Sequence, residues 1–129
     1  MKEVLCVGLG GFVGSIARYM LGGIVLQHSI GWRFPLSTFL VNLAGCFLFG
    51  AVAGVAERHA FLNAELRLLI FTGLLGGFTT FSAFGAESVN LIRRGDVAVA
   101  AAYIIASVLC GFAALWIALK LCGGSAAHA

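Results

Sequence analysis

The chain alternates between long apolar runs and short polar segments. The apolar runs cover roughly residues 4–26, 36–56, 66–92 and 97–121. Each has about the 20 residues that a helix needs to cross the hydrocarbon core of a bilayer. The polar segments between them, such as RRGD at 93–96, contain seven of the thirteen charged residues and the single proline, Pro35. The pattern predicts an all-α integral membrane protein with four transmembrane helices, forming a single domain over residues 1–129.

The composition agrees with a lipid environment. The sequence is 61% hydrophobic and only 10% charged, whereas soluble domains have about 25% charged residues. The first run follows Lys2 as a signal peptide would, but it continues to about residue 26 and contains Arg18. We therefore expect a first membrane helix and no cleaved leader. The cysteines form no CxxC motif and are predicted to be small packing residues rather than metal or disulfide sites: Cys6, Cys46, Cys110 and Cys122.

Lysine and arginine are almost balanced between the two predicted sides of the membrane. With a cytoplasmic N-terminus, the cytoplasmic side has Lys2, Arg58, Arg67 and Lys120, and the opposite side has Arg33, Arg93 and Arg94. Because the Lys/Arg bias of short loops sets orientation, so small a difference predicts that either orientation inserts. Dual topology then follows, with an antiparallel homodimer as its natural product. The alternative is a fixed orientation set by features that this count misses.

Few polar side chains lie inside the apolar runs, and each needs a partner or a water-filled cavity there. Arg18 either snorkels to the interface or gives positive potential to an aqueous vestibule, which would favour anions. Asn42 either joins helices or donates its NH₂ group to a permeating anion. Tyr103 and Ser107 are spaced to share one helix face. For Glu87, in the third run, the sequence indicates no role.

No catalytic constellation is recognisable in the sequence. It contains no HExxH, GxSxG or P-loop motif, and its histidines fall in loops or the tail. Glu87 is the only carboxylate well inside a span, so a paired acid/base mechanism lacks its second member. We expect neither an enzyme nor a nucleic-acid-binding protein.

The third run contains the unusual segment GLLGGFTTFSAF at 73–84. Gly76 and Gly77 each disfavour a helix by roughly 1 kcal/mol relative to alanine, and the threonines after them can bend it further. One interpretation is a broken membrane helix, whose free carbonyls suit a hard cation such as sodium where two copies meet. The other is a continuous helix with glycines for close packing. Phe81 and Phe84 either pack as ordinary core or lipid-facing residues, or present positive ring edges to a small anion.

Three motifs, in order along nearly the whole chain, resemble the Fluc (CrcB) family of fluoride channels. They are GGFVGSIARY at 10–19, STFLVNLAGCFLFG at 37–50 and GLLGGFTTFSAF at 73–84. The resemblance implies an ion channel for passive fluoride export in the inner (plasma) membrane of a prokaryote. It also implies a dual-topology homodimer with two antiparallel pores and a structural sodium ion at its centre.

The resemblance further implies roles for individual residues. The fluoride pore would comprise Asn42, Phe81, Phe84, Thr38, Tyr103 and Ser107. Gly76 and Thr79 would contribute backbone carbonyls to the sodium ion, and Arg18 would face a vestibule. Ala83 stands where the family usually has threonine and Gly85 where serine is common. Gly111 and Leu115 replace hydroxyl residues that some members have, and Ser37 replaces a usual glycine. The polar track along the pore is therefore expected to be thinner here.

Two other functions compete with the channel. A small multidrug-resistance-type exporter is also a four-span dual-topology dimer, but it needs a membrane-embedded carboxylate in its first helix. Here that helix has Arg18 and no acidic residue beyond Glu3. A membrane adaptor that only packs against partners would explain the glycines but not the set of Asn42, Phe81 and Phe84.

Overall fold

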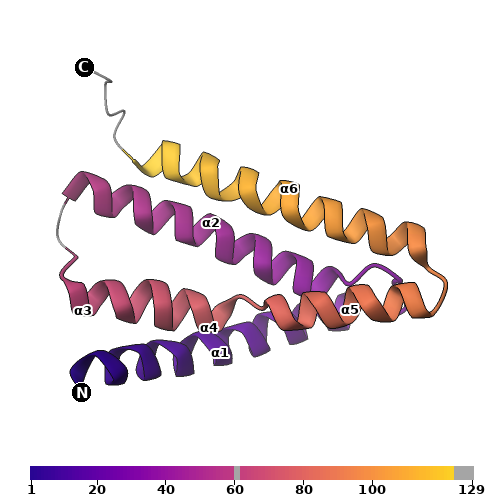
Figure 1. Ribbon diagram of the computed structural model, residues 1–129, viewed down its shortest axis with the longest axis horizontal. Helices are drawn as coiled ribbons and strands as arrows, with labels where there is room; N and C mark the ends of the chain where they lie inside the picture. Colours follow the sequence, from indigo (N-terminus) through magenta and orange to yellow (C-terminus); the bar gives the residue numbers. More distant parts are fainter. Residues whose placement is uncertain (60–61, 124–129) are drawn as a thin grey trace.

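The computed structural model describes residues 1–59 and 62–123, and it consists of helices joined by short connections (Figure 1). Residues 60–61 and 124–129 of the predicted domain lie outside the described residues. The elements are α1 (Lys2–His28), α2 (Leu36–His59), α3 (Ala64–Arg67), η1 (Leu68–Leu75), α4 (Gly76–Phe78), α5 (Phe81–Arg93) and α6 (Val97–Cys122). The described residues contain no strand, as the sequence predicts.

Four helical spans are long and apolar enough to cross a membrane, which confirms this part of the predicted fold class. They are Lys2–His28, Leu36–His59, Ala64–Arg93 and Val97–Cys122. Their ends differ from the predicted ends by up to three residues, because polar residues such as Lys2 and Arg58 continue the helices past the apolar runs. Large apolar side chains face outward between the ends, for example Phe12 and Leu109, each more than 60% exposed. Lipid is the environment that suits such a surface.

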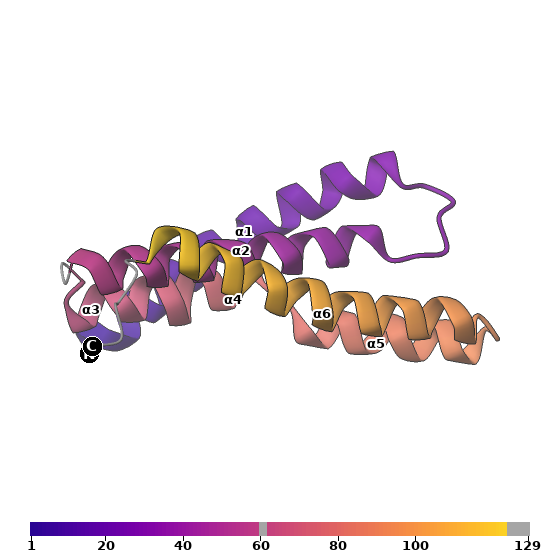
Figure 2. The same cartoon turned by 90° about the horizontal axis from the view of Figure 1, so that it is seen from above.

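The spans pack as two parallel pairs. α1 lies along η1 and α4, while α2 lies along α6. Glycines allow the close approach within the first pair, because a Cβ on Gly10 or Gly14 would collide with main-chain atoms of η1 and α4. Figure 2 shows that α1 then diverges from α5, with which it makes no contact among the described residues. α5 packs instead on α6 and α2.

The third span is interrupted near its middle. Thr79 and Thr80 have extended backbones, with ψ of 157° and 112°, and they separate α4 from α5. The Thr80 hydroxyl accepts a hydrogen bond from the Ala83 N–H at 3.2 Å and so caps the start of α5. The bend thus lies just after Gly76 and Gly77, the pair at which the sequence predicts a weak helix. Gly77 itself is helical, and its lack of a side chain allows close packing on α1, because a Cβ there would lie 2.7 Å from the Gly11 oxygen.

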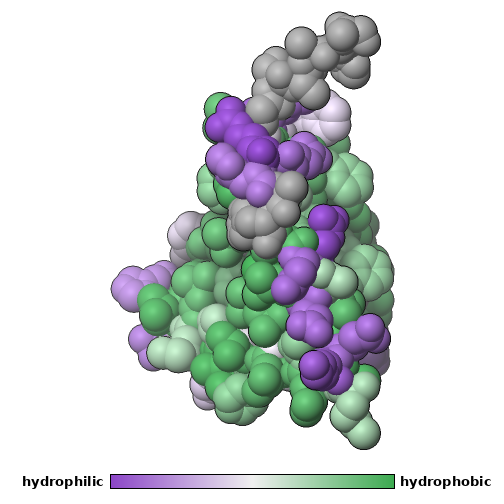
Figure 3. All heavy atoms as spheres, turned by 90° about the vertical axis from the view of Figure 1, so that its left-hand side faces the viewer, coloured by the Kyte–Doolittle hydropathy of each residue, from purple (hydrophilic) through white to green (hydrophobic). Residues whose placement is uncertain are grey.

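Charged residues gather at the two ends of the molecule. Figure 3 looks onto the end where the chain begins, and it shows hydrophilic side chains among apolar ones. The elements that terminate there contribute Lys2, Glu3, Glu57, Arg58, Glu65, Arg67 and Lys120. At the opposite end, Arg33 forms a salt bridge with Asp96 at 3.0 Å and ties the α1–α2 connection to the α5–α6 turn. Polar ends with an apolar belt between them fit a membrane-spanning molecule.

Candidate functional site

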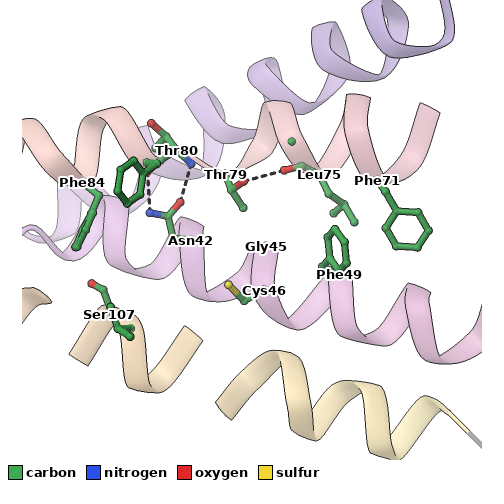
Figure 4. A pocket seen from close by; sticks show the side chains of 13 residues that line it. Asn42, Gly45, Cys46, Phe49, Phe71, Leu75, Thr79, Thr80, Phe84 and Ser107 are labelled. Atoms are coloured by element: carbon green, nitrogen blue, oxygen red, sulfur yellow. Dashed lines mark hydrogen bonds between the residues drawn. The ribbon is translucent and has the colours of Figure 1, made fainter. Parts of the chain in front are cut away.

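A cavity of about 340 Å³ lies between α2, the third span and α6 (Figure 4). It brings together six of the residues that the sequence singled out: Asn42, Gly76, Thr79, Phe81, Phe84 and Ser107. No charged side chain of the described residues lines it. The cavity therefore offers an ion only neutral hydrogen-bonding groups and aromatic rings.

Asn42 holds the interruption of the third span in place. Its carboxamide oxygen accepts a hydrogen bond from the Thr80 N–H at 2.8 Å, and its NH₂ group donates to the Thr80 carbonyl at 3.0 Å (Figure 4). The extended backbone deprives the Thr80 N–H of its helical acceptor, and the Asn42 oxygen on α2 replaces that acceptor. Because the Thr80 N–H can only donate, the amide orientation is fixed. One N–H of Asn42 then remains for another acceptor.

A second cavity, of about 690 Å³, lies on the other side of the interruption, between α1 and α2. Arg18, Thr38, Thr80 and Ala83 contribute to its wall. Thr80 lines both cavities, so its hydrogen-bonded pair with Asn42 lies between them. That Arg18 faces an aqueous vestibule stays a prediction.

Arg18 reaches the interruption from α1. Its Nε–H donates to the Gly77 carbonyl at 3.1 Å. That carbonyl is near the end of α4, where the next turn of helix does not follow. Arg18 thus lies in the wall of the second cavity and donates a hydrogen bond to a backbone carbonyl there.

The carbonyl of Gly76 is also released by the interruption. In a continuous helix the Thr80 N–H would donate to it, but this N–H donates to Asn42 instead. The Ala83 N–H, the helical donor for Thr79, donates to the Thr80 hydroxyl. Both predicted sodium ligands thus have carbonyls whose usual donors are engaged elsewhere. The described residues hold no cluster of three or more His, Cys, Asp or Glu side chains, so a cation here would depend on such carbonyls.

Glu87 joins three helices through two short hydrogen bonds. The Thr38 hydroxyl donates to Oε1 at 2.7 Å, and the Tyr103 hydroxyl donates to Oε2 at 2.7 Å. Tyr103 is fully buried and Thr38 nearly so. These two predicted pore residues therefore lie against Glu87 rather than in the cavity that contains Asn42.

The two phenylalanines of the unusual segment have different surroundings. The ring of Phe84 packs against Tyr103, with centroids 5.2 Å apart. The ring of Phe81 is 5.7 Å from that of Phe84 but is 83% exposed. One ring thus belongs to the interior of the chain, and the other projects from its surface beside the cavity.

Ser107 carries an unpaired polar atom. Among the described residues, its hydroxyl is the only buried side-chain oxygen or nitrogen without a hydrogen-bond partner. Leaving such a group unsatisfied costs about 1–3 kcal/mol. The hydroxyl lies in the wall of the first cavity, where it can donate to a bound anion.

Comparison with known proteins identifies the family. Residues 5–119 match the family described as "CrcB-like protein, Camphor Resistance (CrcB)". The chain belongs to the CrcB family. A fluoride-specific ion channel FluC from Methylobacillus flagellatus is 50% identical over 121 residues, which are 94% of each chain. The FluC of Nitratidesulfovibrio vulgaris is 44% identical over 92% of this chain and 95% of its own, and that of Allorhizobium ampelinum is 47% identical over 94% and 96%.

The CrcB family membership confirms the resemblance found in the sequence motifs, but sequence reasoning missed some functional contacts. The sequence indicates no role for Glu87, although its spacing carries a signal: Thr80, Phe84 and Glu87 have i, i+4, i+7 spacing and share one face of the third span. The bond from Arg18 to Gly77 has no such signal. This hydrogen bond depends on the position of the interruption, which the local sequence does not determine.

Proposed function

We propose that this CrcB protein is a fluoride-specific ion channel. Relatives of 44–50% identity that cover nearly the whole chain are named as such channels. The observation that carries the proposal is the uncharged cavity with two available donors, the second N–H of Asn42 and the unpaired hydroxyl of Ser107. Such neutral donors, with ring edges beside them, bind a small anion weakly enough that it can leave again.

The direction of transport follows from simple electrostatics. Fluoride enters cells as neutral HF from acidic surroundings and dissociates in the cytoplasm, where the charged ion is trapped. A membrane potential that is negative inside drives an anion outward with about 2.3 kcal/mol per 100 mV. A passive pore in the inner membrane of a prokaryote would therefore suffice to lower cytoplasmic fluoride. The protein is then a channel and not an enzyme, in agreement with the lack of a catalytic motif.

The complete channel in this proposal is an antiparallel dual-topology homodimer with two pores. In the single chain, the first cavity opens beside Phe81, whose ring is 83% exposed. Lipid could cover this ring, but lipid could not provide the remaining wall of an ion path. A second copy could, and the near balance of lysine and arginine between the two ends would let that copy insert upside down.

A structural sodium ion would fit at the axis of such a dimer. The Gly76 and Thr79 carbonyls of each copy have lost their helical donors, so two copies would supply four oxygens. Oxygen ligands suit a hard cation. Bound there, the ion would compensate the carbonyls and hold the two interruptions together.

A fluoride efflux measurement tests the proposal. The purified protein is reconstituted in liposomes loaded with potassium fluoride, and a fluoride electrode records release after a potassium ionophore is added. We expect rapid fluoride release without a proton gradient, and little chloride release. Phe81→Ile should slow the release while the dimer elutes unchanged. Phe12→Ala, on the outer surface of α1, is the matched control.

Two results would contradict the channel. A well-folded dimer that releases no fluoride would remove it. Uptake of organic cations coupled to a proton gradient would indicate the small multidrug-resistance-type exporter instead. The structure supplies no carboxylate on α1 within the membrane for that mechanism, since α1 carries Arg18 there and its acidic residue, Glu3, is in the first turn.

A further inference from the structure

Phe49 and Phe71 stand between the first cavity and a third one. Both rings line the cavity that contains Asn42 and Ser107, and both also line a cavity of about 390 Å³ near the end of α2. Their centroids are 4.8 Å apart, and their planes are inclined at 55°. Figure 4 shows the two rings at one end of the first cavity, with Asn42 and Phe84 toward the other.

The three features lie in line along α2. Asn42, Cys46, Phe49 and Ala53 follow at intervals of four, three and four residues and therefore share one face of the helix. The same face reaches Glu57, which lines the third cavity together with Arg67 and Thr72. Fifteen residues of helix correspond to about 22 Å, so the line covers more than half of the 24-residue α2 and ends at its polar end.

The opposite wall is α6, and on its cavity face no polar side chain follows Ser107 toward the Glu57 end. One and two turns farther along α6, the positions on this face are Gly111 and Leu115. A Cβ on Gly111 would lie 3.4 Å from the Cys46 sulfur. An anion that leaves Ser107 toward this end thus passes a thiol and then two phenyl rings.

We propose that the Phe49–Phe71 pair forms a hydrophobic barrier between the anion cavity and the aqueous mouth at the Glu57–Arg67 end. A constriction of this kind limits conduction by excluding water. The Arg67 guanidinium lies 5.9 Å from the Phe71 centroid, a cation–π contact that holds the ring in place from the mouth side. The effect of the barrier on conduction rests on the proposed channel function, whereas the barrier itself is a property of the two rings.

Cys46 reports on the barrier without any fluoride measurement, because its thiol lines the cavity behind the rings. The parent for the test has Cys6→Ser, Cys110→Ser and Cys122→Ser, so that Cys46 is the one remaining thiol. A small cationic methanethiosulfonate reagent is added to the dimer, and the labelling rate is measured by mass spectrometry. We expect slow labelling in the parent and at least tenfold faster labelling after Phe49→Ala or Phe71→Ala.

Controls separate the barrier from a general loosening of the fold. Phe12→Ala should leave the Cys46 rate unchanged, and Thr72→Cys on a background without native cysteines should label quickly because it lies at the mouth. Phe71→Leu, which retains most of the apolar bulk, should stay slow and covers the case in which the alanine variant does not fold. Equal labelling of Cys46 in the parent and in the alanine variants would overturn the proposal.

Fluoride efflux from the same proteins completes the test. We expect Phe71→Ala to release fluoride several-fold faster than the parent and to admit chloride. A parent that protects Cys46 but conducts no fluoride would remove the channel and keep the barrier. A conducting parent with an unprotected Cys46 would remove the barrier and keep the channel.

Discussion

The carboxylate of Glu87 and the hydroxyl of Tyr103 lie 2.7 Å apart and connect α5 to α6 in the interior of the molecule. The same carboxylate accepts a second hydrogen bond from Thr38 on α2. A carboxylate has two acceptor oxygens, and each of them accepts one of these bonds. Glu87 thus connects α2, α5 and α6 near the interruption.

Replacing Glu87 with glutamine should weaken this assembly. The amide has a single acceptor oxygen, so either Thr38 or Tyr103 loses its acceptor and faces an NH₂ group. We expect Glu87→Gln to lower the free energy of unfolding by about 1–3 kcal/mol, measured by thermal unfolding of the dimer in detergent. Tyr103→Phe is the matched variant: it also removes one of the two bonds, but it places no NH₂ group against a hydroxyl donor, so its effect should be smaller. Equal melting temperatures for all three proteins would contradict this role.

Ser107→Ala should have opposite effects on stability and on conduction. The substitution removes a buried hydroxyl that has no partner, so the variant should be as stable as the parent or more stable by about 1 kcal/mol. It also removes a donor from the cavity wall, so fluoride efflux should fall several-fold. Melting curves and electrode traces on the same preparation give both values. A loss of stability together with unchanged efflux would show that the hydroxyl serves packing and not the ion.

Asn42→Asp tests the electrostatics of the cavity. The carboxylate can still accept the Thr80 N–H, but it adds a negative charge to a cavity that has none and opposes the Thr80 carbonyl. Since like charges repel strongly away from water, fluoride efflux should fall at least tenfold. Asn42→Ala lacks the charge but also loses both hydrogen bonds, so it should unfold more easily. If the aspartate variant conducts as the parent does, anions do not pass this point.

Arg18 should act through its charge as well as through its hydrogen bond. Arg18→Lys keeps the charge in the second cavity, and Arg18→Gln removes it while retaining a donor near Gly77. We expect the glutamine variant to conduct fluoride several-fold more slowly at low ionic strength, with the lysine variant close to the parent. The difference should shrink as salt is raised, because screening reduces the attraction of anions. A difference that is independent of salt would mean that the backbone contact alone matters.

The four spans could be predicted because apolar length is a local property, readable without knowing any contact. The interruption could not be placed as well, although Gly76 and Gly77 signalled weakness. A helix bends where its neighbours allow it, and Gly77 is held straight by the close approach of Gly11. The interruption therefore lies after Gly77, at Thr79 and Thr80, where Asn42 supplies the acceptor that the Thr80 N–H lacks.

In the candidate site, too, the sequence indicates which residues take part but not the contacts that depend on helix packing. The sequence singles out Asn42, Phe84 and Ser107, and all three line one cavity in the structure. The spacing of Glu87 indicates its helix face but not its partners Thr38 and Tyr103, because these depend on the relative rotation of α2 and α6. That rotation is set by close packing at positions such as Gly50, where a Cβ would collide with the backbone of Leu115.

The two parts of the third span belong to different packing units. η1 and α4 lie against α1, whereas α5 lies against α6. The peptide link between Thr79 and Thr80 is therefore the junction, or seam, of the two packing units. One side chain of α2, that of Asn42, holds it through two hydrogen bonds to Thr80. Small relative movements of the two units concentrate at this seam rather than inside a helix. The walls that face the ion can then shift by fractions of an ångström while the packing of each unit stays intact.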